Sequence, residues 1–223
     1  MEEQRVLNTV RRIDTPLSQY YTGTIRNRDS PPEAIRNALD ALGREVGREL
    51  ISLLRLEPAV VVTPLNETCS TLQLRDELTA VVTTKADLEL YGKAIAAMIE
   101  PAIVGFMDFG GRRGLAALDS PVREIELPAS RGRQVSYLVI AKSVLATGCT
   151  AVSLTRTAMG HYSPNRLVIA TLFYSLSGIH ELASEFPEAE FLVVGNADRL
   201  DDAGMLHPGV GLIEQRAYRT IAP

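Results

Sequence analysis

A turn of small residues, Ala146-Thr147-Gly148, stands between an apolar run and an amphipathic stretch; it is called the small-residue turn below. Residues 137–140 have the length of a buried strand, and apolar residues recur at helical spacing over residues 151–159. A strand, a tight turn and a helix aim several backbone N–H groups and the positive end of the helix dipole at one point. This pattern favours a bound phosphate, although an ordinary connection between strand and helix has the same local pattern.

Three side chains near such a site each allow two interpretations. Lys142 is either a solvated lysine at the end of a strand or a cationic partner for a phosphate or carboxylate. Cys149 is either a small buried residue or a reactive thiol at the helix N-terminus. His207, beside Pro208, is either a surface imidazole or an acid/base group in the site.

Composition narrows the classes of function. The chain has 223 residues and a net charge of −4, which argues against nucleic acid as a partner. Cys69 and Cys149 match no metal-ligand spacing, so we predict no metal ligands and a reducing, cytoplasmic setting. The N-terminus lacks the apolar core of a secretory signal, and no apolar stretch has the roughly 18 residues of a membrane helix.

The elements that would position these residues alternate between strands and helices. Apolar residues from Ile35 to Leu54 recur at helical spacing, and residues 86–99 and 178–186 also predict helices. The sequence predicts strands over residues 59–63, 78–83, 102–107, 137–140, 167–172 and 191–194, and residues 122–127 suit a half-exposed strand or arm. We therefore expect one α/β domain, residues 1–223, built on a doubly wound, mostly parallel sheet. Ligands bind such sheets at the carboxyl ends of the strands, where the small-residue turn would lie.

Two longer motifs resemble those of the uracil phosphoribosyltransferase family. Leu145-Ala146-Thr147-Gly148-Cys149-Thr150 is similar to that family's phosphoribosyl-pyrophosphate loop, usually D-P-M-L-A-T-G-G-S. Residues 204–211, Gly-Met-Leu-His-Pro-Gly-Val-Gly, followed by Arg216 and Thr220, resemble its uracil-binding tail, usually G-Y-I-V-P-G-L-G-D-A-G-D-R-x-F-G-T. Pro16-Leu17 with Arg26 and Asp29 is similar to its N-terminal H-P-L and R-x-x-D elements. The resemblance covers residues 14–220.

The resemblance implies a type I phosphoribosyltransferase fold with a small β arm or hood. Residues 1–30 would form an N-terminal extension or hood, and residues 196–223, called the tail below, would recognise the base. It further implies a homodimer and a small-molecule nucleobase or sugar-phosphate ligand. The phosphate or phosphoribosyl-pyrophosphate (PRPP) site would comprise Lys142, Ser143, Ala146, Thr147, Gly148, Cys149, Thr150, Lys85 and Arg112. The base site would comprise Leu206, His207, Gly211, Leu212 and Ile213.

The sequence departs from the family pattern where charge is needed. Lys142 replaces the acid that engages the ribose hydroxyls, and lysine offers donors but no acceptor. Cys149 replaces a glycine where the backbone approaches the phosphate, and Leu212 replaces an acid in the tail. Lys85 aligns with an arginine of the family's R-A-G motif and loses the bidentate fork. Mg²⁺ is the cofactor that the family's chemistry implies, and Lys142 in place of the acid argues against it.

Three functions stay open on these residues. The first is an enzyme of this fold that acts on a different base or on a phosphorylated nucleoside. The second is a non-catalytic protein that binds a nucleotide or sugar phosphate. The third is a uracil phosphoribosyltransferase that converts uracil and PRPP to UMP and pyrophosphate, with the lost groups supplied from neighbouring positions.

Overall fold

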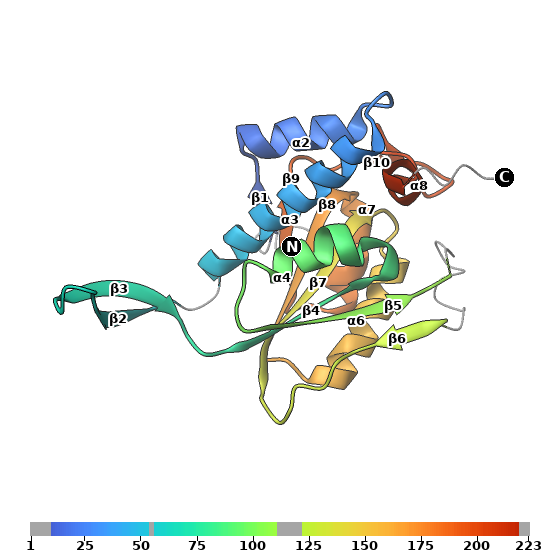
Figure 1. Ribbon diagram of the computed structural model, residues 1–223. Helices are drawn as coiled ribbons and strands as arrows, with labels where there is room; N and C mark the ends of the chain where they lie inside the picture. Colours follow the sequence, from blue (N-terminus) through green and yellow to red (C-terminus); the bar gives the residue numbers. More distant parts are fainter. Residues whose placement is uncertain (1–9, 54–55, 111–121, 219–223) are drawn as a thin grey trace.

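Seven strands form the central sheet, in the order β1-β9-β8-β7-β4-β5-β6 (Figure 1). The computed structural model describes residues 10–53, 56–110 and 122–218. Neighbouring strands are parallel except β5 and β6, which are antiparallel. The strands of this sheet are β1 (Val10–Ile13), β4 (Leu78–Thr84), β5 (Ala102–Asp108), β6 (Glu124–Glu126), β7 (Val135–Leu145), β8 (Arg166–Tyr174) and β9 (Glu190–Val194).

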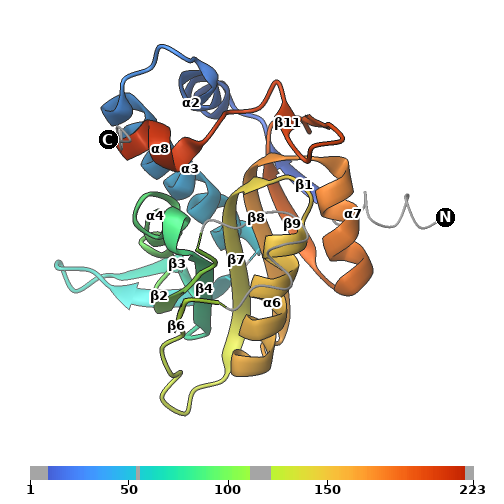
Figure 2. The same cartoon turned by 90° about the vertical axis from the view of Figure 1, so that its right-hand side faces the viewer.

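Helices cover both faces of the sheet, as Figure 2 shows. On one face α3 and α4 pack on the strands, and α6 and α7 pack on the other, so that a separate hydrophobic core fills each interface. The predicted doubly wound, mostly parallel α/β sheet is therefore confirmed. The helices are α2 (Pro16–Arg26), α3 (Pro32–Leu53), α4 (Lys93–Ala96), α6 (Cys149–Tyr162), α7 (Leu176–Glu185) and α8 (Ile213–Tyr218).

Strand β7 is buried on both faces, which explains its continuous apolar run. Tyr137 and Val139 pack in the core beneath α3, and Leu138 and Ile140 pack in the core beneath α6. The strand is longer than the four residues that the apolar run predicts, because its ladder with β8 continues to Leu145. Lys142 and Ser143 consequently lie within the strand.

The segment after β4 is irregular where the sequence predicts one helix over residues 86–99. A 3-10 turn, η1 (Lys85–Asp87), leads into a π-helical turn, η2 (Leu88–Gly92), and only then into α4. The side chain of Asp87 is hydrogen-bonded to β7, which ties the start of this segment to the sheet. A side chain at Gly92 would place a Cβ 2.9 Å from Cγ2 of Thr83, so the segment packs closely on β4.

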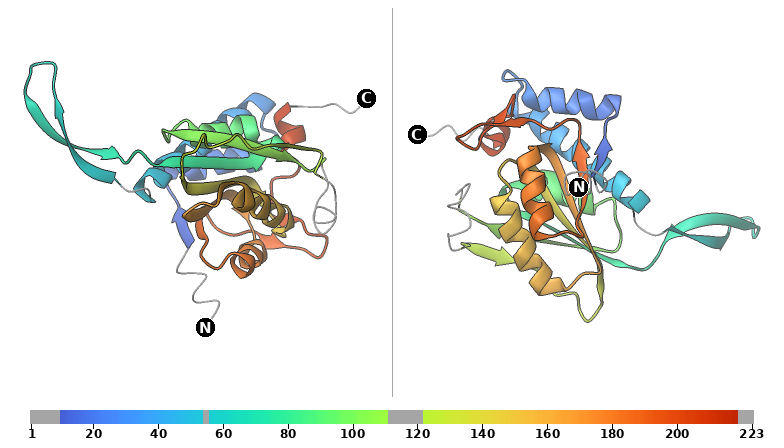
Figure 3. Two further views of the ribbon diagram at one scale, coloured as in Figure 1. Left: turned by 90° about the horizontal axis from the view of Figure 1, so that it is seen from below. Right: turned by 180° about the vertical axis from the view of Figure 1, so that it is seen from behind.

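An antiparallel hairpin extends from the body of the molecule, as Figure 3 shows. It consists of β2 (Leu56–Val62) and β3 (Thr68–Leu74). This hairpin is the arm of the fold; residues 124–126, inside the segment considered for that role, form the edge strand β6 instead.

The tail packs against the N-terminal helices. It contains a small hairpin, β10 (Arg199–Leu200) with β11 (Leu206–His207), followed by α8. Arg26 of α2 donates two hydrogen bonds to the carboxylate of Asp198, at 2.8 and 2.9 Å, and a third to the carbonyl oxygen of Gly209 at 3.0 Å. These contacts fix the tail beside the carboxyl ends of the strands. Among the described residues, no helix has the length and apolar character needed to cross a membrane.

Candidate functional site

The small-residue turn is shaped by Gly148 and held by the start of α7. Gly148 precedes α6 with a φ of +87°, in the left-handed region that suits glycine, and no side chain caps the helix. The hydroxyl of Ser175 donates to the carbonyl oxygen of Ala146 at 2.6 Å. A Cβ at Gly178 would lie 2.5 Å from that same oxygen, so α7 approaches the turn as closely as its backbone allows. The first N–H groups of α6 are thus left for another acceptor.

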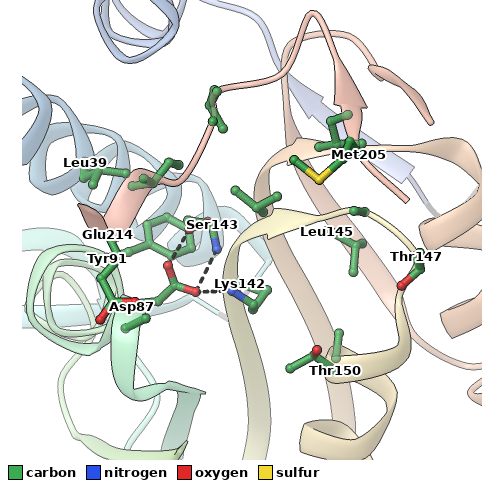
Figure 4. A pocket seen from close by; sticks show the side chains of 18 of the residues that line it. Leu39, Asp87, Tyr91, Lys142, Ser143, Leu145, Thr147, Thr150, Met205 and Glu214 are labelled. Atoms are coloured by element: carbon green, nitrogen blue, oxygen red, sulfur yellow. Dashed lines mark hydrogen bonds and ion pairs between the residues drawn. The ribbon is translucent and has the colours of Figure 1, made fainter. Parts of the chain in front are cut away.

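A cavity of about 340 Å³ lies beside this turn (Figure 4). One side comes from the end of β7, the turn and the start of α6, and the other from α3, η2, the tail and α8. Its apolar lining on that second side includes Leu39, Leu90, Tyr91, Leu206, Val210, Ile213 and Ala217. The cavity therefore joins a polar, backbone-rich side to an apolar wall, the usual composition of a small-molecule site.

Most of the predicted site residues line this cavity. From the predicted phosphate site, the lining includes Lys142, Ser143, Ala146, Thr147, Gly148 and Thr150. From the predicted base site it includes Leu206, Gly211 and Ile213. Cys149 is buried, and it is absent from the cavity lining, as are His207 and Leu212. Arg112 and Thr220 lie outside the described residues.

Lys85, a predicted phosphate-binding cation, and His207, a predicted acid/base group, are each paired with a carboxylate away from the cavity. The ammonium of Lys85 lies 2.5 Å from Glu124 of β6, and both side chains are about half exposed. Nε2 of His207 lies 2.6 Å from the carboxylate of Asp201 across the β10–β11 hairpin. That carboxylate also accepts the backbone N–H of Met205, and this bond and His207 lower the pKa of Asp201.

Asp87, Lys142 and Ser143 line the cavity and are hydrogen-bonded to one another (Figure 4). Together with Thr84, which is hydrogen-bonded to Asp87 behind them, they are called the Asp87 cluster. Lys142 Nζ donates to Asp87 Oδ2 at 2.6 Å, and the Thr84 hydroxyl donates to the same oxygen at 3.0 Å. The Ser143 hydroxyl donates to Oδ1, and the Ser143 backbone N–H lies 3.4 Å from Oδ2. One carboxylate therefore meets four donors.

The donors keep Asp87 ionised in spite of its burial. Burial disfavours the charged form, but the positive charge of Lys142 and the hydrogen bonds from Lys142, Ser143 and Thr84 outweigh it, so the pKa of Asp87 is lowered. The side chain of Asp87 is 8% exposed and that of Lys142 is 17% exposed. The ammonium is thus the more accessible half of a largely buried ion pair.

Tyr91 lines the same cavity and carries a buried, unpaired polar atom. Its hydroxyl is buried and has no hydrogen-bond partner among the described residues. Burial, and secondarily the negative charge of Asp87, raise the pKa of Tyr91 well above its ordinary value, so the phenol stays protonated. A buried hydroxyl without a partner is costly, and a polar ligand atom reaching it would remove that cost.

Comparison with known proteins decides the family. The family model described as uracil phosphoribosyltransferase matches residues 12–220. The chain belongs to the uracil phosphoribosyltransferase family. The resemblance carried by the small-residue turn and the tail is confirmed, and the mostly parallel α/β sheet agrees with a phosphoribosyltransferase fold.

Members of the uracil phosphoribosyltransferase family resemble this chain over most of its length. A protein of Aquifex aeolicus named uracil phosphoribosyltransferase is 30% identical over 207 residues, which are 92% of this chain and 96% of the relative. A protein of Thermococcus sibiricus with the same name is 28% identical over 210 residues, which are 92% of this chain and 87% of the relative. A solved structure of an Aquifex aeolicus protein matches with a TM-score of 0.79 at 28% identity, over 95% of this chain and 98% of that one.

The residues at the carboxyl ends of the strands do not fit the Mg²⁺ that this family implies. A divalent cation is held by carboxylates and by substrate phosphates. Lys142 stands where the family has an acid, and Asp87 already accepts hydrogen bonds from Lys142, Ser143 and Thr84. Within the part of the chain that the structure describes, no group of three or more His, Cys, Asp or Glu side chains is arranged to hold a metal.

Among the lining residues that the sequence did not predict, Asp87 and Tyr91 matter most for the chemistry of the site. Asp87 belongs to Lys85-Ala86-Asp87, whose alignment with the family's R-A-G motif points to Lys85 and not to the acid. An acid close to the new Lys142 in space is not visible from sequence, because the two are 55 positions apart. Tyr91 lies in an apolar stretch that predicts only helix, and its irregular backbone gives no sequence signal.

Proposed function

We propose that this protein binds a phosphorylated ribose ligand with its phosphate at the small-residue turn and a nucleobase against the tail. In this proposal it is an enzyme of the phosphoribosyltransferase class of glycosyltransferases, acting on a nucleobase or a nucleoside or sugar phosphate. The observation that carries it is the single cavity lined by both the turn and the tail. The names of the relatives, uracil phosphoribosyltransferase, support the same class of ligand.

The chain's own groups suit the binding half of such a reaction. The uncapped N-terminus of α6 and the hydroxyls of Thr147 and Thr150 offer donors to a phosphate. The apolar side of the cavity, with Leu206, Val210 and Ile213, offers a surface against which a planar base can pack. In the reaction the bond from ribose C1 to the pyrophosphate oxygen breaks, a bond from C1 to a base nitrogen forms, and that nitrogen loses its proton.

A specific observation favours a second candidate, a non-catalytic protein that binds a nucleotide or sugar phosphate. The carboxylate of Asp87 is engaged by Lys142 and two hydroxyls, which leaves it poorly placed to accept hydrogen bonds from ribose hydroxyls. Such acceptors contribute to transfer more than to binding, because they act on the charge that develops at the ribose. The unmodified reaction of uracil with PRPP is the third candidate and rests on the relatives' names alone.

The hairpin β2–β3 supports the proposal of a homodimer. It carries the exposed apolar side chains Val60, Val62, Leu65 and Leu72, each more than 60% accessible. A two-stranded hairpin with such a surface is marginal in water unless another surface covers it. We place the protein in the cytoplasm and propose small molecules, with neither nucleic acid nor a membrane, as its other partners.

Titration calorimetry with PRPP, alone and with uracil, tests the proposal. We expect PRPP to bind with micromolar to millimolar affinity and a base to change that affinity. Release of pyrophosphate on mixing PRPP with a set of nucleobases then separates the enzyme from the binder. Binding without turnover by any base would select the non-catalytic protein, and no binding of PRPP or ribose 5-phosphate would overturn both.

A further inference from the structure

The starting point is the position of the Lys142 ammonium. It belongs to β7, four positions before the small-residue turn, and its side chain lines the cavity together with Asp87. The ammonium of Lys142 carries three N–H donors, and among the described residues one of them is hydrogen-bonded to Asp87. The remaining donors are available to an anionic ligand in the cavity.

Asp87 restrains this ammonium, because it is itself held by three other groups. The hydroxyls of Thr84 and Ser143 and the backbone N–H of Ser143 all meet its carboxylate. A lysine side chain loses considerable rotamer freedom when it is ordered, and here that loss has already occurred in the folded protein. The cation therefore stands at the cavity before a ligand arrives.

The same arrangement disfavours a divalent cation at this edge of the cavity. The Asp87 oxygens are occupied by donors, and the fixed ammonium repels a second positive ion. The function that a metal would serve, charge opposite the ligand's anionic oxygens, is available from Lys142 and the N-terminus of α6.

We propose that the Lys142–Asp87 pair takes the place of a divalent cation, so that this site binds a ribose phosphate or PRPP independently of Mg²⁺. This inference rests on the proposed function, since it names how that site meets the charge of its ligand. Asp87 is a positioning residue, and Lys142 contacts the anionic group of the ligand.

Calorimetric titrations with PRPP and with ribose 5-phosphate, at fixed ionic strength with either EDTA or MgCl₂, test the inference. We expect the two dissociation constants of each ligand to agree within about twofold. The double variant Asp87→Asn/Lys142→Met, which removes both charges together and so avoids an unpaired buried carboxylate, should bind about 10- to 100-fold more weakly in either condition. Lys93→Met, in an exposed pair with Glu89, is the matched control and should leave affinity unchanged.

A second double variant, Asp87→Gly/Lys142→Asp, exchanges the fixed ammonium for an acid at the same strand position. It should bind PRPP at least several-fold more tightly with MgCl₂ than with EDTA. Tighter binding of the wild-type protein with MgCl₂, by tenfold or more, would overturn the inference while leaving the proposed ligand class intact. The same conclusion follows if both double variants bind as the wild type does. No binding of either ligand in any condition would overturn the proposed function and this inference with it.

Discussion

The two sides of the cavity are built by different means. On the side of β7 and α6, the shape comes from the backbone. Gly148 has a left-handed conformation, α6 has no side-chain cap, and the carbonyl oxygen of Ala146 packs closely on Gly178. On the side of η2 and the tail, the character comes from side chains: an apolar wall, with Asp87 at its margin hydrogen-bonded across to Lys142 and Ser143 of β7. The path of the backbone is preserved by most substitutions, whereas a charged side chain can be replaced when a neighbouring charge compensates the replacement. This difference explains how a family site keeps its turn while its acid becomes a lysine.

The largest expected effect is on the Asp87 cluster, which joins the two sides. Lys142→Met leaves Asp87 ionised and largely buried without its cation, so we expect a loss of about 3–5 kcal/mol in the free energy of unfolding. Chemical denaturation of the variant measures it. The double variant Asp87→Leu/Lys142→Met should recover most of that loss. The exposed, solvent-screened pair Arg44–Asp40 provides a control whose removal should change stability far less.

The dependence of stability on pH should also reveal the Asp87 cluster. The pKa of Asp87 is lowered in the folded state, below the value of about 3.9 for an unfolded carboxyl. Its stabilising contribution is therefore complete above about pH 4 and is lost as the pH falls through its folded-state pKa. In denaturation between pH 2 and 7, the difference between wild type and Asp87→Asn should be largest near neutrality and shrink in acid. A difference that stays constant across that range would show that protonation of Asp87 does not contribute to acid destabilisation.

The small-residue turn, whose shape comes from the backbone, should lose stability when one methyl group is added at Gly148. Gly148→Ala places a Cβ in the left-handed region, 3.0 Å from Glu181 Cβ and from the carbonyl oxygen of Gly178. We expect about 1–2 kcal/mol of destabilisation and a clear loss of PRPP affinity. Gly160→Ala, inside the helix α6 that follows Gly148 and with nothing within 4 Å of the new Cβ, should instead stabilise by up to about 1 kcal/mol. Equal melting temperatures for the two variants would contradict this account of the turn.

The smallest effect should be at Tyr91. Tyr91→Phe removes a buried hydroxyl that has no partner in the described protein, so thermal stability should stay equal or rise by less than about 1 kcal/mol. Ligand affinity should fall if a ligand atom pairs with that hydroxyl. Melting curves with and without PRPP separate the two effects, and a fall in stability without ligand would show that the hydroxyl has a partner in the protein.

Sequence reasoning succeeded where one local pattern determines the structure. The apolar run before the small-residue turn, the glycine in it and the periodic residues after it predict strand, turn and helix. It did not predict the Asp87 cluster, because ion pairing between η1 and β7 depends on which strands become neighbours. It also predicted one regular helix where η1 and η2 interrupt it, because the contacts of this segment with β4 and β7 are not visible in helical periodicity.

The length of β7 has a consequence for how this gene can change. From Tyr137 to Ala141 successive residues of the strand alternate between the two hydrophobic cores, and the strand then carries Lys142 and leads into the small-residue turn. A codon inserted or deleted within it would send every later side chain to the opposite face, with a lysine driven toward a core. Variation along this strand is therefore confined to replacement of one residue by another, which is the kind of change that Lys142 itself represents.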